Sequence, residues 1–409
     1  MNFFNTKSVN FRVLVSGGVL LLILGAVYFF GYSETLTFDR GEAVMSDVAT
    51  TSASNAITNR VNTATNTKKT NVVASVIPEI NTYLAASATP MLIVPLAHLY
   101  PAEYDAKILE LANLPHLKVA SSTTASSTAT STIARRPGPW PVTRAPYPKD
   151  GALLPFHRIV AYYGNLFSKQ MGVLGKYPAD QMLAMLASTT AAWTAADPAT
   201  PAIPALDYIV TVAQGSAGFG GKYRSRMPPK EIDKVIALAA QVHGIVILDV
   251  QVGLSDVRSE VPLLAPYLKL PQVHLALDPE FAMHGGKKPG TIIGTMDAAD
   301  INFVAQYLAQ LVRDNNLPPK VLFVHRFTKD MLTNYKKITP LPEVEIVIDM
   351  DGFGYPAKKI GTYTQVVVPE PVQFTGFKLF YVNDVATGHM MTPKEVLKLS
   401  PRPSFIQYQ

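Results

Sequence analysis

Apolar, strand-like runs recur eight times between residue 158 and the end of the chain, and this rhythm leaves few folds open. Each run is short and rich in Val, Ile, Leu or aromatic residues, as buried strands are. The eight runs cover residues 159–164, 208–213, 245–251, 273–280, 321–327, 344–351, 377–381 and 405–408. Because segments with helical spacing separate most of them, strands and helices are expected to alternate.

Helix signals fill most of the gaps between these runs. Asp297 is a good N-cap, and the apolar residues that follow it recur on one stripe. Thr392, Pro393 and Glu395 form a capping box with proline at the first helical position. The predicted helices cover residues 178–196, 228–242, 258–268, 297–316 and 329–337, and a last one starts at residue 392.

Eight strands alternating with helices over about 250 residues predict a (β/α)8 barrel, the TIM-barrel fold. The alternative is an open doubly wound sheet, which usually carries a glycine-rich nucleotide-binding turn after its first strand. Residues 164–168 read Gly-Asn-Leu-Phe-Ser, which is not such a turn. Barrel closure also explains the strand at residues 405–408, because an eighth strand must pair with the first.

The N-terminal part of the chain predicts a membrane anchor. Residues 13–32 carry no charge and are long enough to cross a bilayer as a helix. Lys7 and Arg12 precede this segment, so the positive-inside rule places the C-terminal domain outside the cytoplasm of a single-pass cell-membrane protein. A cleaved signal peptide is the alternative, but the bulky aromatic residues at 28–32 favour an uncleaved anchor.

Composition divides the chain into three parts. Residues 1–40 form the cytoplasmic tip and the anchor. Residues 41–150 form a flexible linker of low complexity, rich in Ala, Ser and Thr, with a small helical segment predicted within 76–117. Pro101 can open that helix at its first position. Residues 151–409 form the barrel domain.

Charge and cysteine content exclude several classes of function. The net charge of +6 is spread along the chain, and no Lys/Arg cluster alternates with aromatic residues, so no nucleic-acid partner is predicted. The chain has no cysteine. Disulfides, thiolate metal sites and cysteine nucleophiles are therefore excluded.

Polar residues interrupt the apolar runs at the point where the predicted strands end. Residues i and i+2 of a strand share a face, so each pair of polar residues at this spacing projects the same way. Three pairs follow the pattern: Asp249 with Gln251, Asp278 with Glu280, and Asp349 with Asp351. Pro279 cannot donate to a strand ladder and marks the end of one. The acids are therefore expected at the C-terminal face, where barrel enzymes place their chemistry.

A single acid at a strand end usually caps a helix or forms a loop salt bridge, but five carboxyls from three strands are costly to bring together without a function. A carboxyl crowded by others keeps its proton near neutral pH, as a general acid must. The predicted catalytic residues are Glu280, Asp278, Asp349 and Asp351.

Seven further residues are predicted to bind substrate: Asp249, Gln251, Tyr162, Tyr163, His325, Lys378 and Tyr381. Alternatives remain open for several of them. His325 is a ligand, a catalytic base or a satisfied interior histidine. Lys378 either pairs with the acids or binds a substrate anion. The tyrosines either stack on sugars at the barrel mouth or fill its top.

The barrel region resembles a group of uncharacterised bacterial surface proteins with a glycoside-hydrolase-like barrel. The similarity covers about residues 155–409 and rests on short motifs: Ala161-Tyr162-Tyr163-Gly164, Met171-Gly172-Val173-Leu174-Gly175, Leu277-Asp278-Pro279-Glu280, Asp351-Gly352-Phe353-Gly354, Lys378-Leu379-Phe380-Tyr381 and Pro401-Arg402-Pro403. Asp278-Pro279-Glu280 is also similar to the Asp-x-Glu strand end of lysozyme-type muramidases, which implies that Glu280 is the acid. The Gly-Ile-Asp opening of their first strand is absent.

These features predict a membrane-anchored glycosidase that acts on cell-envelope or surface polysaccharide, or on a peptidoglycan-like polymer, by carboxylate acid/base catalysis. Such a reaction needs no metal and no cofactor, and none is assigned. One alternative is a metal-dependent phosphodiesterase or other hydrolase, because the acids and His325 could bind a cation. The other is a surface glycan-binding module without catalysis.

Overall fold

The computed structural model describes residues 97–113, 139–142 and 144–409. The predicted membrane anchor at 13–32 and most of the predicted linker lie outside these ranges. No helix within them is long and apolar enough to cross a membrane.

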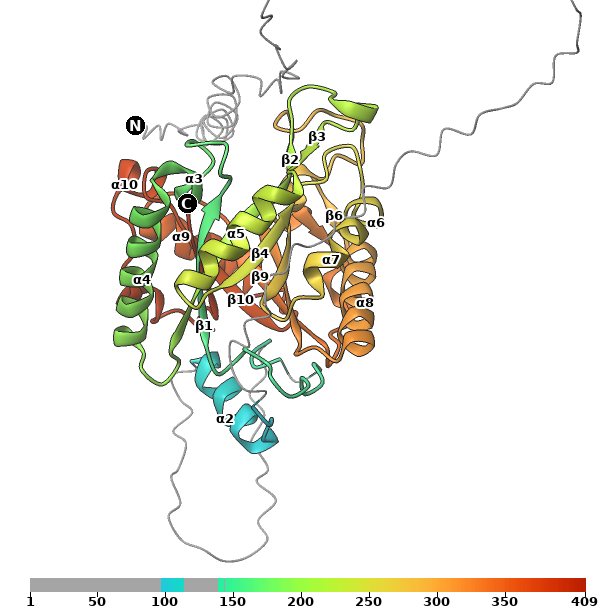
Figure 1. Cartoon of the computed structure of the whole chain (residues 1–409). Helices are drawn as coiled ribbons and strands as arrows, with labels where there is room; N and C mark the ends of the chain where they lie inside the picture. The colour runs from blue at the N-terminus through green and yellow to red at the C-terminus, as the bar shows by residue number, and fades with distance from the viewer. Residues whose placement is uncertain (1–96, 114–138, 143) are drawn as a thin grey trace, which may run out of the picture.

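Within the described residues, eight parallel strands close into a barrel, which confirms the predicted TIM-like fold (Figure 1). The barrel strands are β1 (Arg158–Gly164), β2 (Ala202–Ala213), β4 (Ile245–Val250), β5 (Val273–Leu277), β7 (Lys320–Arg326), β9 (Val344–Met350), β10 (Phe374–Leu379) and β11 (Phe405–Tyr408). Each strand pairs with the next along the chain, and β1 pairs with both β2 and β11. The last strand therefore closes the barrel, with Ile159 opposite Phe405.

Some strand boundaries differ from the sequence expectations. β2 begins at Ala202, six residues before the expected residue 208, and β10 begins at Phe374 instead of 377. β5 ends at Leu277, and a 3-10 turn, η3 (Pro279–Phe281), follows it. Pro279 has no amide hydrogen to donate to a neighbouring strand. The parallel pairing of β5 therefore ends at Leu277, before Asp278 and Glu280.

Helices surround the barrel wall. They are α3 (Val173–Lys176), α4 (Ala179–Ala196), α5 (Pro229–Gln241), α6 (Val257–Glu260), α7 (Ala265–Leu268), α8 (Ala298–Asn315), α9 (Pro356–Thr362), α10 (Asn383–Thr387) and α11 (Pro393–Val396). The capping box predicted at Thr392 and Glu395 is present. So is the N-cap at Asp297, whose side chain accepts a bond from the Ala299 amide.

Two predicted helices are wrong in form. Residues 329–337 form η4 (Lys329–Met331), β8 (Leu332–Thr333) and η5 (Tyr335–Lys337), because β8 pairs with β6 (Met296–Asp297). The segment 258–268 is split into α6, η2 (Val261–Leu264) and α7, since Pro262 and Pro266 each remove a helical donor. The sequence reasoning also missed α9 and the π-helical turn η6 (Tyr363–Val367) that continues it.

Alternation along each strand separates two cores. The outer core lies between strands and helices and holds, for example, Val246, Leu248 and Val250 of β4. The inner core lies inside the barrel and holds Ile245 and Ile247 of the same strand. The prediction that residues 249 and 251 face inward follows the same parity.

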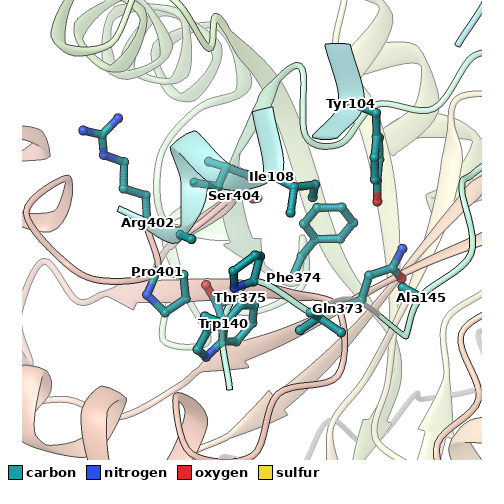
Figure 2. Close-up of a pocket in the computed structure, with 14 residues that line it drawn as sticks. Tyr104, Ile108, Trp140, Ala145, Gln373, Phe374, Thr375, Pro401, Arg402 and Ser404 are labelled. Carbon is teal, nitrogen blue, oxygen red and sulfur yellow. The ribbon is translucent and has the colours of Figure 1, made fainter. Parts of the chain in front are cut away.

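The helix α2 (Pro101–Ala112) closes the N-terminal end of the barrel (Figure 1). Its buried Tyr104 and Leu111 belong to the inner core. Figure 2 shows Ile108 of α2 beside Phe374 at the start of β10, where a small cavity remains. That cavity has a volume of about 20 Å³, which suits one water molecule and no larger ligand. The opposite end of the barrel is therefore the place to look for a functional site.

Candidate functional site

Charged side chains fill the inside of the barrel at the C-terminal ends of its strands. We call this set the acidic layer. Its members are Asp207 on β2, Asp249 on β4, Asp278 after β5, His325 on β7, Asp349 on β9, Asp351 after β9, and Lys378 on β10. Each one continues the inward face of its strand, beyond the apolar residues of the inner core. Every side chain in the layer is at most 9% exposed.

His325 lies at the centre of the acidic layer. Its Nε2 is 2.8 Å from an oxygen of Asp249, and its Nδ1 lies 3.3 Å and 3.4 Å from oxygens of Asp349 and Asp351. Burial by itself lowers the pKa of His325, but these carboxylates outweigh it and raise the pKa well above its usual value. Of the predicted roles, the structure shows an interior histidine with acidic partners on both ring nitrogens.

Lys378 is the second cation of the layer. Its Nζ is 3.0 Å from Asp351 and 4.0 Å from the centre of the Tyr163 ring. Burial lowers the pKa of Lys378, but Asp351 and then Asp349 more than offset this, so the net shift is upward. Lys378 therefore pairs with the acids, which is one of its two predicted roles.

Gln251 joins the acidic layer to the neighbouring strands β1 and β2. Its Nε2 donates to Asp278 and to the Tyr163 hydroxyl, both at 3.2 Å, and its Oε1 accepts from the Ala213 amide at 3.0 Å. Burial raises the pKa of Asp278 to about 7, and the nearby Asp249 also raises it, while His325 acts in the opposite direction.

Glu280 sits above the layer at the barrel mouth and is only partly buried. It lies in η3, where its amide donates to Asp278 at 3.1 Å, so the two acids do not share a strand face as expected. They still interact through space. Burial raises the pKa of Glu280 to about 8, and the charges of Asp278 and Asp351 add to the effect. Glu280 thus carries a proton at neutral pH.

Two of the predicted tyrosines do not line the mouth. Tyr162 is fully buried in the outer core, and its hydroxyl bonds to Thr189 of α4 and to Tyr381. Tyr381 packs its ring 5.5 Å from that of Tyr408. The reason is parity, since Tyr162 and Tyr163 are adjacent in β1 and must face opposite sides. Tyr163 is the one that faces the acidic layer.

The sequence reasoning missed three residues of this site. Asp207 and Gln407 lie inside strands β2 and β11, and the Gln407 Nε2 donates to Asp207 at 2.6 Å. The predicted second strand began at 208, so the acid in its apolar run was overlooked. Gly376 lies opposite Asp349, and a Cβ there would overlap the Asp349 carboxylate. The absence of a side chain at this position gives Asp349 its space.

Carboxyl groups outnumber cationic groups in this part of the barrel. The layer and Glu280 together contain six carboxyl groups, whereas His325 and Lys378 supply two cations. Several carboxyl oxygens are buried without a hydrogen-bond partner among the described residues: Asp207 Oδ1, Asp249 Oδ1 and both oxygens of Asp349. Such a layer must hold protons or a bound cation, because unpaired buried charge is very costly. Asp207, Asp249 and His325 offer donor atoms that lie within 4.8 Å of one another.

Compared with models of known protein families, the chain matches none, and no curated protein is similar to it in sequence. The chemistry of the site must therefore be argued from its own geometry.

Proposed function

We propose that the protein is a membrane-tethered glycosidase that acts on polysaccharide of the cell envelope or cell surface. The observation that carries the proposal is the contrast between two carboxyl groups at the barrel mouth. Glu280 is held in its protonated form by burial and by neighbouring acids. Asp351 is paired with the Lys378 ammonium at 3.0 Å. Glycoside hydrolysis requires one carboxyl group that donates a proton and a second one that acts as nucleophile or base.

Each group then has a defined task. Glu280 protonates the leaving glycosidic oxygen. Asp351 serves as nucleophile or activates a water molecule at the anomeric carbon. Asp278 and Asp349 are positioning residues in this scheme, since Asp278 bonds to the Glu280 amide and Asp349 lies beside His325. Asp249, Gln251 and Tyr163 support the layer from below the mouth.

Access distinguishes this reaction from metal-dependent hydrolysis. The metal-ligand candidates Asp207, Asp249 and His325 are fully buried below the mouth, whereas Glu280 is partly exposed. A polymer cannot reach a cation at the buried position, whereas Glu280 is partly accessible to solvent. The acids at the mouth therefore favour a reaction that proceeds by proton transfer.

The predicted anchor at 13–32 and the linker that follows it complete the proposal. A barrel held outside the membrane by a flexible tether would meet polymers of the envelope. The C-terminal mouth lies at the end of the barrel opposite α2, the helix that falls within the predicted linker region (Figure 1).

Glu280→Gln tests the proposed function in the full-length protein. Loss of a general acid lowers turnover by about 10²- to 10⁴-fold, while the similar shape of glutamine preserves the fold. Release of reducing ends from purified peptidoglycan and surface polysaccharides measures the activity. Glu103→Gln is the matched control, because Glu103 is an exposed acid on α2 at the other end of the barrel. Equal turnover by Glu280→Gln and the parent protein would refute the assignment.

A non-catalytic glycan-binding module is the other outcome of this experiment. In that case the parent protein binds a polysaccharide and never releases a product, whatever residue stands at 280.

A further inference from the structure

Part of the acidic layer lies outside the proposed catalytic pair, Glu280 and Asp351, and takes no part in the proposed proton transfers. Asp207, Asp249 and His325 come from strands β2, β4 and β7, and all three side chains are 0% exposed. Each offers one donor atom, and these atoms lie within 4.8 Å of one another. Three ligand atoms held on rigid strands at such separations need only small shifts to surround an ion about 2 Å from each.

Free oxygen atoms give a second and independent indication. Asp207 uses one oxygen to accept from Gln407, and Asp249 uses one to contact His325. The other oxygen of each acid is buried without a partner in the described part of the chain, and so is the Oε1 atom of Gln407. Native proteins seldom leave buried carboxylate oxygens without partners, unless an ion or a water molecule satisfies them.

We propose that Asp207, Asp249 and His325 bind one buried divalent cation, with Gln407 Oε1 as the fourth ligand. The ion has a structural role and does not bind the proposed catalytic carboxyls, although its ligand His325 contacts Asp351 through Nδ1 at 3.4 Å. It neutralises the part of the acidic layer that Lys378 does not reach, since Lys378 pairs with Asp351. On binding, it takes the place of the proton between His325 and Asp249 and of any other proton on its ligands, so protons are released.

The donor set indicates the class of cation. Two carboxylates, an amide oxygen and an imidazole are a mixed set of borderline hardness, which suits Zn²⁺ or Mn²⁺ better than Ca²⁺ or Mg²⁺. Four protein donors in a fully buried position match the closed, four-coordinate arrangement of structural zinc sites. Zn²⁺ is therefore the favoured ion.

Burial decides how the site must be tested. A chelator cannot reach the ion in the folded protein, so the full-length protein is unfolded with EDTA, freed of metal and refolded. Refolding proceeds with Zn²⁺, Mn²⁺ or Mg²⁺, or with EDTA alone, and unbound metal is then removed. Elemental analysis gives the metal content and thermal unfolding gives the Tm. The expected result is about one Zn²⁺ per chain and a Tm at least about 5 °C above that of the EDTA sample.

Two variants locate the site. Asp207→Asn removes one ligand charge and is expected to lower zinc content at least tenfold and to abolish the zinc-dependent rise in Tm. Glu345→Gln is the matched control, because Glu345 is equally buried inside the barrel but lies at its other end. It should keep one zinc per chain.

The parent protein alone can overturn the proposal, even where Asp207→Asn fails to fold. If it refolds without bound metal and has the same Tm in Zn²⁺, Mn²⁺, Mg²⁺ and EDTA, the acidic layer is neutralised by protons only. Zinc retained in full by folded Asp207→Asn would also refute this assignment of ligands.

Discussion

The two ends of the barrel interior both bury ionisable groups, but they satisfy them differently. At the N-terminal end, Glu345 accepts hydrogen bonds from the Leu153 and Leu154 amides at 3.2 Å and 3.0 Å. His274 accepts from the Val321 amide at 3.0 Å. Main-chain donors thus satisfy each of these two side chains separately. At the C-terminal end, acids face other acids around two cations, and several oxygens have no partner among the described residues.

We interpret this difference as one between groups that stabilise the fold and groups that serve the proposed function. Burial of a charge is costly at both ends, and a group that serves only the fold is satisfied by nearby main-chain atoms. Groups that repel one another and share protons persist where chemistry needs perturbed pKa values. The α2 helix closes the first end, whereas Glu280 is partly exposed at the second. The acidic layer is therefore the end of the barrel at which we propose the function.

The largest effect on stability is expected from Lys378→Met. This change leaves Asp351 without its ammonium partner among other buried acids, and breaking a buried pair costs about 3–5 kcal/mol. Urea unfolding measures the free energy of unfolding. Lys358→Met is the matched control, because Lys358 is exposed. If the free energy of unfolding fell as little as in the control, the stability of the acidic layer would not depend on Lys378.

Gly376→Ala is expected to have a smaller effect. The new Cβ would overlap the Asp349 carboxylate and approach Phe405 Cδ1 to 2.9 Å, so the strand or the acid must shift. Overpacking of this kind costs about 1–3 kcal/mol. Gly361→Ala in α9 meets open space and should be neutral or stabilising. Thermal unfolding of both variants checks the contrast, and equal Tm values would show that Asp349 has room to move.

The pattern of apolar runs predicted all eight barrel strands, because strands that are buried on both faces are short, nearly continuous apolar runs. It could not fix where pairing ends. Because of Pro279, Glu280 lies in the turn η3 and not in β5, although Asp278 and Glu280 still interact. Asp207 was overlooked because a single acid next to an apolar run looks like the residue that precedes the strand. Its partner Gln407 is 200 residues away in the chain, and only closure of the barrel brings them together.

The smallest effect is expected at the N-terminal end, from Glu345→Gln. Burial raises the pKa of Glu345 to about 8, above its ordinary value of 4.5, and the Leu153 and Leu154 amides only partly offset this. Between these values the folded state holds a proton that the unfolded state has lost, so stability falls as pH rises from about 4.5 to 8. Glutamine does not titrate. Urea unfolding across this range should therefore show a shallower fall for the variant, and parallel curves would place the Glu345 pKa near its ordinary value.

The pH dependence of reducing-end release by the full-length protein tests the central claim most directly. Glu280 must be protonated to act as the acid, and burial raises its pKa to about 8. The kcat/KM is therefore expected to stay high through neutral pH and to fall tenfold per pH unit above about 8. Activity that falls already near pH 5, or that continues unchanged to pH 10, would contradict the assignment of Glu280 as the catalytic acid.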